Sequence, residues 1–498
     1  MRNALIARIG TLFAVTSLLL LIISPASAQT FSSVTDGSTP SALTPGAPAG
    51  SYALNGFENV NLFNGNLNIA LPMVHVGGRG NVDFTMMLTI EQHWRIRKPK
   101  PAPNCELSGT CDLRFPWPSW WASMLSDYGP GVLQGRKPGV RCGDLSLTRL
   151  TFSAPGGTEF ELRDQLSNGQ PLPFACGASQ GASRGTIFVT SDGSAATFVS
   201  DTPIFDTTSQ SSTTFTPSGY LMLRDGTRYR IDAGKVTWMR DRNGNKLTFT
   251  YSGSKVISIT DSLNRQVNIA YSVPDVAPYG TCDQITLKGF GGAQRMIRVA
   301  KTSLANALRT TRPGDSTTTW TFKQLFPDLD GSATSQHNPT VVSSLWLPDG
   351  RRYRFYYNVY SELTRVEVPT GGALEYDFAN ATNPYDGIYR RVMERRVYPD
   401  GANLESRTTY SDGIASPVTV DVRDGSGTLV ARSKHYFYGN PFNSLNQFPT
   451  EYSEWKEGRE YQTEVFDSNG TTLLRRTTNT WQQRSAVSWW TGTSDLAP

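Results

Sequence analysis

The sequence predicts an all-β protein built from antiparallel hairpins. Short runs that alternate apolar and polar residues recur at spacings of about eight to twelve residues, and each run is bounded by Gly, Asn, Asp or Pro. Nothing between these runs is long enough for the helix that a parallel crossover needs. The composition agrees, because Gly occurs 45 times and only 18% of the residues are charged. Such a mixture favours short strands and tight turns over helical bundles.

The N-terminus has the pattern of a cleaved export signal. Arg2 and Arg8 give a positively charged start, residues 12–23 are apolar, and Ala26 and Ala28 have the small-residue spacing that signal peptidase recognises. We therefore expect residues 1–28 to be removed and the chain to be exported, so that it is secreted, periplasmic or on the cell surface. The alternative is an uncleaved membrane anchor, for which the apolar stretch is short.

Three further regions are predicted after the signal. Residues 29–51 contain almost no large apolar residue and are expected to form a flexible linker. Residues 52–200 form an N-terminal β domain, and residues 201–498 form a region of repeated hairpins. One strand of the N-terminal domain is predicted to place five apolar side chains on one face: Val82, Phe84, Met86, Leu88 and Ile90.

An irregular excursion is predicted within the N-terminal domain, over residues 93–142. The alternation stops there, the segment is rich in Pro, Trp, Cys and basic residues, and only residues 120–128 have the pattern of a short helix. Its aromatic side chains either cover the edge of a sheet or form a binding surface. The residues concerned are Trp117, Trp120 and Trp121.

One phrase of eleven residues occurs twice. DRNGNKLTFTY starts at residue 241 and DSLNRQVNIAY starts at residue 261. In each copy we expect the Asp side chain to accept a hydrogen bond from a backbone N–H of the turn, and Gly244 or Asn264 to take a positive φ. The strand that follows ends in Tyr251 or Tyr271, whose ring is expected to be buried with its hydroxyl at a solvated rim. Hairpins of this kind would form one continuous ribbon.

A second phrase is also duplicated. DGTRYRI starts at residue 225 and DGRRYRF starts at residue 349. Asp-Gly is a strong signal for a hairpin turn. The alternate arginines are expected to face solvent and to pair with carboxylates across strands, and the alternative is that they form an anion site.

These patterns resemble the YD repeat of the RHS-repeat protein family. The likeness is carried by VISIT, DSLNR and the tyrosines within residues 220–272, and by LPDGRRYRFYYNVYSELTRVEVPTGGALEYDF at residues 347–378, which contains the pair Tyr376-Asp377. VNLFNGNLNIALP, from residue 60, resembles the segment that precedes the repeats in long bacterial members. The resemblance covers roughly residues 53–480. It implies a β-sheet wound into a curved sheet or partial shell, which encloses a toxic C-terminal region or serves as a cell-surface contact element.

The sequence also departs from the pattern of that family. Tyr251 and Tyr271 are followed by Ser rather than Asp, and no counterpart of the family's C-terminal core with its self-cleavage aspartate is found. We therefore expect the N-terminal portion of a larger system, or a shortened member.

Five cysteines in an exported chain favour structural disulfides. The pairings expected first are Cys105–Cys111 and Cys142–Cys176, which leave Cys282 unpaired. No C-x-x-C spacing occurs, so a zinc site is not predicted.

Two motifs suggest chemistry but lack the necessary context. GASQG has Ser179 at the position of a hydrolase nucleophile, yet prolines precede it and a strand is predicted after it, whereas the motif needs a helix there. Asp241, Asn243 and Asn245 have the spacing of calcium ligands, but Lys246 stands where that loop needs glycine, and PDLDG at residues 327–331 is equally incomplete. The two incomplete calcium loops, at residues 241–245 and 327–331, are better explained as Asx turns. The candidate general bases are His75, His93, His337 and His435.

The sequence thus predicts a non-enzymatic RHS/YD-repeat scaffold, with no catalytic, cofactor-binding or metal-ligating residue and no cofactor. The alternative is a surface module that binds carbohydrate or protein through the excursion, and a secreted hydrolase is a more distant one. Removing Arg2 and Arg8 lowers the formal charge from +5 to +3, so nucleic acid is not expected as a partner. The expected partners are a downstream RHS core or toxin segment, or cell-surface carbohydrate or protein. No stable membrane span is expected after signal cleavage.

Overall fold

The computed structural model of the chain describes residues 51–481, except for residues 54–56, 64, 78–79, 81, 98–118, 123–127, 155–158, 176, 191–194, 328–333, 383–386, 412–416 and 440–457. In the described residues, 29 strands form one hydrogen-bonded network, and β7 (Leu145–Ser146) pairs separately with β10 (Leu172–Pro173). Helices in this part of the chain are limited to α2 (Phe322–Leu325) and the 3-10 turns Phe290–Gly292 and Leu304–Asn306. The predicted all-β fold is confirmed.

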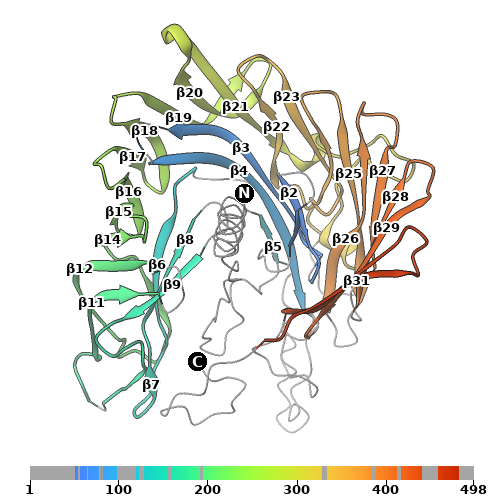
Figure 1. Cartoon of the computed structure of the whole chain (residues 1–498). Helices are drawn as coiled ribbons and strands as arrows, with labels where there is room; N and C mark the ends of the chain where they lie inside the picture. The colour runs from blue at the N-terminus through green and yellow to red at the C-terminus, as the bar shows by residue number, and fades with distance from the viewer. Residues whose placement is uncertain are drawn as a thin grey trace, which may run out of the picture.

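A long antiparallel meander forms the outer wall of the molecule (Figure 1). From β14 onward each strand pairs with the next one along the chain, which antiparallel strands can do through short turns. The strands are β14 (Gly219–Met222), β15 (Arg228–Asp232), β16 (Lys235–Arg240), β17 (Lys246–Ser252), β18 (Lys255–Asp261), β19 (Gln266–Val276), β20 (Gly280–Lys288), β21 (Gln294–Ser303), β22 (Thr340–Trp346), β23 (Arg352–Tyr357), β24 (Leu363–Glu367), β25 (Ala373–Thr382), β26 (Gly387–Tyr398), β27 (Ser406–Tyr410), β28 (Val418–Asp424), β29 (Leu429–Phe437), β30 (Glu460–Phe466) and β31 (Leu473–Thr478).

The first strands of this wall close into a ring. Pairing runs in the order β6, β8, β9, β11, β12, β14, β15 and β16, and it returns to β6 through Lys235 and Val132. The strand β13 covers another part of the edge of β6. The additional strands are β6 (Val132–Lys137), β8 (Arg149–Ser153), β9 (Glu159–Asp164), β11 (Ser183–Val189), β12 (Thr197–Phe205) and β13 (Thr213–Phe215). Closure leaves this part of the sheet with no long open edge.

The hairpin turns repeat one hydrogen-bond pattern, which the duplicated phrase encodes. Asp241 donates its N–H to Asn245 and accepts from Gly244, and the turn that starts at Asp261 has the same two bonds. Gly244 has φ 91° and Asn264 has φ 58°, so the predicted left-handed positions are confirmed. The carboxylate of Asp241 accepts from the N–H groups two and four residues on, at 2.9 Å each, and Asp261 does the same. The phrase is therefore a turn that carries its own side-chain cap.

Tyrosine hydroxyls close three of these hairpins at a fixed distance along the chain. The hydroxyl of a tyrosine on the second strand donates to the carbonyl of a buried valine fifteen residues earlier, on the first strand, at 2.8 Å in every case. The pairs are Tyr251 with Val236, Tyr271 with Val256, and Tyr357 with Val342. The rings of Tyr251 and Tyr271 are only half-buried, so the predicted burial is met in part, and their hydroxyls are bonded to backbone carbonyls of the protein. We call these three bonds the tyrosine staples.

The staples coincide with irregularities that bend the sheet. The register shifts between Thr250 and Tyr251 in β17, and between Tyr356 and Tyr357 in β23. A further shift follows Ala270, beside Tyr271 in β19. Extra residues of this kind bend a strand and increase its twist. The position of the staple tyrosine therefore does two things in each hairpin. Its register shift bends the sheet, and its hydroxyl joins the two strands.

A second, smaller layer lies on the concave side of the meander (Figure 1). Its strands pair antiparallel in chain order, and they are β1 (Ser51–Ala53), β2 (Glu58–Asn61), β3 (Leu67–Gly77) and β4 (Asp83–Arg97). We call these four strands the inner layer. The end of β4 also pairs with β5 (Ser119–Ala122) and with β26 of the outer wall.

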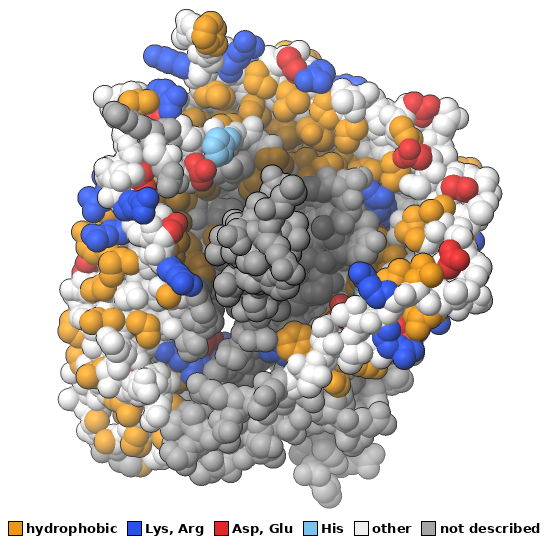
Figure 2. Space-filling model, viewed as in Figure 1, with side chains coloured by type: hydrophobic (Ala, Val, Ile, Leu, Met, Phe, Trp, Pro, Cys, Tyr) orange, Lys and Arg blue, Asp and Glu red, His pale blue; other side chains and the backbone are white. Residues whose placement is uncertain are grey.

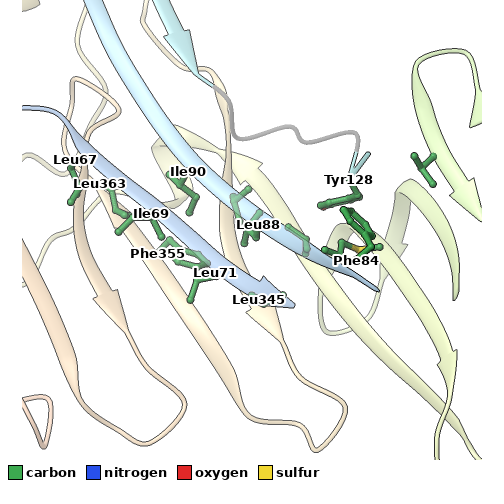
Figure 3. Packing of buried hydrophobic residues seen from close by; sticks show 14 of the residues in the cluster. Leu67, Ile69, Leu71, Phe84, Leu88, Ile90, Tyr128, Leu345, Phe355 and Leu363 are labelled. Carbon is green, nitrogen blue, oxygen red and sulfur yellow. The ribbon is translucent and has the colours of Figure 1, made fainter. Parts of the chain in front are cut away.

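The hydrophobic core lies between the inner layer and the outer wall. All five side chains that the sequence places on one face of β4 and its approach are buried: Val82, Phe84, Met86, Leu88 and Ile90. The ring of Phe84 packs edge-on against Phe249 of β17, with 5.4 Å between centroids. Figure 3 shows Leu67, Ile69 and Leu71 of β3 clustered with Leu345, Phe355 and Leu363 of the wall. A single sheet cannot bury its own apolar face, so the inner layer supplies the second layer that the wall needs.

The structure agrees only in part with the predicted boundaries of elements and domains. The first described strand begins at Ser51, close to the predicted start at Tyr52. The short helix predicted over residues 120–128 is wrong for its first part, because Ser119–Ala122 pairs as a strand with β4. The boundary predicted at residue 200 falls inside β12, and the division into domains stays a prediction. The signal peptide, nearly all of the linker and residues 98–118 of the excursion lie outside the described residues.

The tyrosine staples give a graded prediction for stability. Tyr357 is completely buried, so Tyr357→Ala should lower the free energy of unfolding by about 3–5 kcal/mol. Tyr251→Ala and Tyr271→Ala should cost less, because both side chains are only half-buried. Each Tyr→Phe change removes only the hydroxyl and leaves a valine carbonyl unpaired, which should cost about 1 kcal/mol. Chemical denaturation of the six variants measures these values, with Thr250→Ala on the exposed face of β17 as the control. Equal stability of all six with the parent would contradict the role of the staples.

Candidate functional site: the inner face of the shell

The face that the wall and the inner layer enclose is the part of the molecule most able to hold another group. Figure 2 shows it as a hollowed surface, with apolar side chains on its upper wall and charged side chains near its rim. Three polar contacts lie along this face; two of them join the inner layer to the wall, and the other joins the segment at Tyr128 to the wall.

The first contact is a buried ion pair at β2. The guanidinium of Arg395, on β26, donates through Nε to Glu58 Oε1 at 3.1 Å and makes a second bond to the same oxygen. The hydroxyl of Tyr376, on β25, donates to the other carboxylate oxygen. Burial and the adjacent carboxylate raise the pKa of Tyr376 well above its usual value, so the phenol stays protonated. Tyr376 is the tyrosine of the Tyr-Asp pair in the sequence, and here it attaches the inner layer to the wall.

The second contact surrounds Asp283 of β20. Its carboxylate accepts from the hydroxyl of Tyr128 at 2.9 Å, from Lys301 Nζ at 2.7 Å and from the N–H of Ser272 at 2.8 Å. The ring of Tyr128 stacks on Tyr271, with 5.6 Å between centroids. Burial, followed by the nearby carboxylate, raises the pKa of Tyr128 well above its usual value. The chain that leaves the excursion is thus bound to one of the staple tyrosines.

The third contact joins the duplicated turns to the β3–β4 hairpin. Arg265 donates to the carbonyl of Gly77 at 2.7 Å. A Cβ on Gly80 would lie 2.3 Å from a carboxylate oxygen of Asp241 and 2.2 Å from the side-chain nitrogen of Asn245. Gly80 also has φ 83°. Only glycine fits this approach, so both copies of the phrase position the tip of the inner layer.

A fourth buried charge, which sequence reasoning missed, lies inside the ring of strands. Arg184 is completely buried and bonds two carboxylates, Asp164 at 3.2 Å and Asp206 through Nε at 2.9 Å. Its other donors meet the carbonyl of Gln170 and the hydroxyl of Ser167. The three charged side chains are far apart in sequence, so no local pattern could predict them. A fully paired arginine of this kind is structural.

The serine-hydrolase motif does not form a catalytic elbow. Ser179 is exposed in a bend, and the next element along the chain is the strand β11. The helix that the motif requires is missing from this position, as the sequence predicts.

The four histidines have four different environments. His75 is exposed beside Thr85, and His93 lies in β4 opposite Trp121. His337 is buried, and its Nε2 lies 2.7 Å from the hydroxyl of Ser361. His435 is the fourth, and it belongs to the one group with the order of a proton relay.

That group is Ser433, His435 and Glu460. The Ser433 hydroxyl lies 2.9 Å from Nε2 of His435, and Nδ1 of the same ring lies 2.7 Å from Glu460. These distances match a nucleophile, base and orienting acid. However, Ser433 sits in mid-sheet, paired with Val420 on one side and Val465 on the other. Its backbone N–H therefore belongs to a ladder and is not aimed at a developing oxyanion. Sequence reasoning missed this group, since Glu460 lies on another strand.

The metal and cysteine predictions have mixed outcomes. The side chain of Asp241 caps its own turn, so the Asx-turn interpretation is confirmed there, and residues 328–331 of the second candidate loop lie outside the described residues. No group of three metal-binding side chains occurs in the described part of the chain. Cys142 is disulfide-bonded, but its expected partner, Cys176, is outside that part. Cys282 is buried and free, as expected. Cys105 and Cys111 are also outside, and the pairing of those two stays a prediction.

The duplicated arginines behave only partly as predicted. Arg230 pairs with Asp201 and Asp232 at 2.6 Å, and Arg354 pairs with Glu367 at 3.3 Å. By contrast, Arg352 lies over the ring of Trp346, 4.2 Å from its centroid. Within the described residues, Arg228 has no carboxylate within 4.0 Å. The side chains of Trp120 and Trp121, and all of Trp117, lie outside what the structure describes.

Comparisons with known proteins found no related sequence and only weakly similar structures. No protein-family model and no curated protein matches this chain. A porin-like protein from Bacteroides uniformis is 12% identical with a TM-score of 0.18, over 54% of this chain and 96% of the other. The complex TcdB2-TccC3-TEV is 10% identical with a TM-score of 0.22, over 83% and 22%. The Photorhabdus luminescens Tc holotoxin pore is 10% identical with a TM-score of 0.19, over 67% and 19%.

The chain thus spans about a fifth of the two Tc toxin structures that it resembles weakly. TM-scores this low do not establish a common fold, so family and function must be argued from the residues of this chain. The described residues include no helix with the length and apolar character of a membrane span.

Neutralising Glu58 alone should strongly destabilise the protein, because its partner Arg395 stays buried and charged. Glu58→Gln leaves Arg395 buried without a counter-charge, so the free energy of unfolding should fall by about 3–5 kcal/mol. Arg476→Gln breaks a pair with Glu464 whose arginine is 54% exposed, and it should cost less than about 1 kcal/mol. Urea denaturation of both variants makes the comparison. Similar small losses in both would show that Glu58 does not hold the inner layer in place.

His337 should make stability depend on pH. Burial lowers its pKa in the folded state from 6.5 to about 4. Below pH 6.5 the unfolded chain binds a proton at this histidine that the folded chain does not. The free energy of unfolding is therefore unaffected by His337 above pH 6.5 and falls as the pH is lowered from 6.5 toward 4. The loss should reach about 3 kcal/mol. Denaturation of the parent and His337→Gln between pH 7 and pH 4 isolates it. A parent-minus-variant difference that does not change with pH would contradict this prediction.

Proposed function

We propose that the protein is a non-enzymatic scaffold of the RHS/YD-repeat type. The observation that supports this most is the tyrosine staple, which recurs at one chain distance in three hairpins. A catalytic or ligand-binding group has no reason to recur with the same internal spacing in several hairpins, whereas a unit that builds a curved wall does. The two copies of the eleven-residue phrase also contact the tip of the inner layer. Arg265 bonds the carbonyl of Gly77, and Asp241 and Asn245 lie against Gly80. These contacts support a structural use of the phrase.

The partner of such a wall is a polypeptide or a surface. The resemblance to RHS repeats favours a C-terminal segment that is held inside the shell, and the hollowed face in Figure 2 is compatible with that. The N-terminal signal pattern favours export, and we propose a secreted, periplasmic or cell-surface location. A carbohydrate- or protein-binding surface module is the second candidate, and exposed arginine and aromatic side chains on the wall favour it.

Protease protection tests the enclosing role. A flexible tail with one protease site, added after Pro498, should be cut slowly while the shell is folded and rapidly above its melting temperature. The same protease site inserted beside Phe290, which is fully exposed in the turn between β20 and β21, serves as the control and should be cut rapidly at both temperatures. Tyr357→Ala should lose protection at a lower temperature than the parent. Equal cutting of the two sites in the folded protein would reject enclosure.

The non-enzymatic proposal is tested at its two strongest serine candidates. Purified protein should not react with a fluorophosphonate probe at Ser433, because the residue lies in a paired strand, nor at Ser179, because no base is placed beside it in an elbow. Ser433→Ala and Ser179→Ala should leave any background ester hydrolysis unchanged. Labelling that disappears in one of these variants alone would assign an activity to that serine and overturn the proposal.

A further inference from the structure

A row of positive charges crosses the outer face of the wall at β15, β16 and β17. Arg228 lies directly opposite Arg240, and Arg240 lies directly opposite Lys246. Among the described residues, none of the three has a carboxylate within 4.0 Å. Like charges placed directly opposite one another destabilise a sheet. The repulsion within this row is therefore not offset by a carboxylate of the described residues, and we call these three residues the cation row.

The cation row belongs to the outer face because its neighbours in each strand face inward. Met239 and Leu247, next to Arg240 and Lys246 in the chain, are buried, and the strands alternate. Figure 2 shows Lys and Arg side chains gathered along the left rim, in the region of β16 and β17. The exposed side chains of Arg224 and Arg242, in the turns beside the row, extend the positive surface.

One aromatic ring restrains two of the three cations. Arg240 and Lys246 both lie over the ring of Trp238, at 5.5 Å and 5.0 Å from its centroid. The ring of Tyr220 is 5.9 Å from that of Trp238, and it carries Arg230, a neighbour of the row, at 4.8 Å. Cation–π contacts at such distances restrain a cation without neutralising it. Two members of the row are thus held in place while they stay positive.

The second duplicated hairpin, which has the same arginine pattern, does not form such a row. There Trp346 lies between Arg298 and Arg352, so that each arginine is opposite a ring and not opposite another cation. Arg354 of the same hairpin pairs with Glu367. The first hairpin neutralises Arg230 with Asp201 and Asp232, and Asp225 caps the N–H of Thr227. The cation row is therefore left for an external anion.

We propose that the cation row binds an acidic polysaccharide. Neighbouring strands are about 4.8 Å apart, so the three cations form an evenly spaced line. Such a line suits a polymer that carries an anionic group on successive units. Guanidinium groups bind carboxylates and sulfates through paired hydrogen bonds. Tyr220 is 41% exposed, and it adds a hydroxyl that can hydrogen-bond to the hydroxyls of a sugar. Single-stranded nucleic acid fits less well, because base stacking needs free aromatic faces and both rings carry cations.

The experiment measures binding of fluorescent oligomers by anisotropy over a series of salt concentrations. The probes are a heparin oligosaccharide, a polygalacturonate oligomer and an oligo(dT) of equal charge, which distinguish sulfate, carboxylate and nucleic acid sources. Arg228→Gln/Arg240→Gln should weaken binding of at least one polysaccharide tenfold or more at low salt. It should also lower the slope of log affinity against log salt by about one per cation removed.

The matched control removes two exposed cations from another hairpin of the wall. Lys288→Gln/Arg295→Gln, on β20 and β21, should change affinity less than twofold. Because repulsion is relieved, the Arg228→Gln/Arg240→Gln variant should melt at or above the temperature of the parent. The proposal is overturned if the parent binds neither polysaccharide at low salt, if oligo(dT) binds best, if the control loses as much affinity, or if the test variant melts clearly lower.

Discussion

A sheet only one layer thick has an apolar face that it cannot bury by itself, and this constraint governs the whole molecule. The inner layer meets it. Strands β3 and β4 lay their apolar side chains along the concave side of the wall, and the ring of Phe84 meets Phe249 on one side while Phe63 meets Phe437 on another. Without that contact the apolar side chains of the wall would face water, and its curvature would have nothing to enclose.

Polar anchoring gives the two layers one fixed arrangement. Apolar packing alone would tolerate several positions of the inner layer, since hydrophobic contact is not directional. The pairing of Glu58 with Arg395 and Tyr376 is directional and buried, so a displaced inner layer would leave charges unpaired. The close approach of Gly80 to Asp241 and Asn245 adds a steric limit at the other end of β3 and β4.

Curvature arises from the repeating unit and not from the anchors. Each staple joins the open end of a hairpin to its partner strand, where the register also shifts. The valine at one end of the unit and the tyrosine at the other are as regular in sequence as the turn between them. A search for Val and Tyr fifteen residues apart would have found all three staples, including the one at Tyr357 that lacks the duplicated phrase. The outer face is under weaker constraint, and the cation row lies on it.

The sequence by itself determined the strand content, the turn chemistry and the inward face of each strand, because alternation, Asx capping and positive φ are local properties of a few residues. It therefore predicted the turns at Asp241 and Asp261 and the burial of Met86 and Leu88 correctly. Only the tertiary structure decided that the inner layer lies inside the wall, that Tyr376 meets Glu58, and that Arg228, Arg240 and Lys246 form a row. Those contacts join residues that are separated by intervening turns or by hundreds of positions. Pairing register and layer packing place them, and no local pattern encodes either.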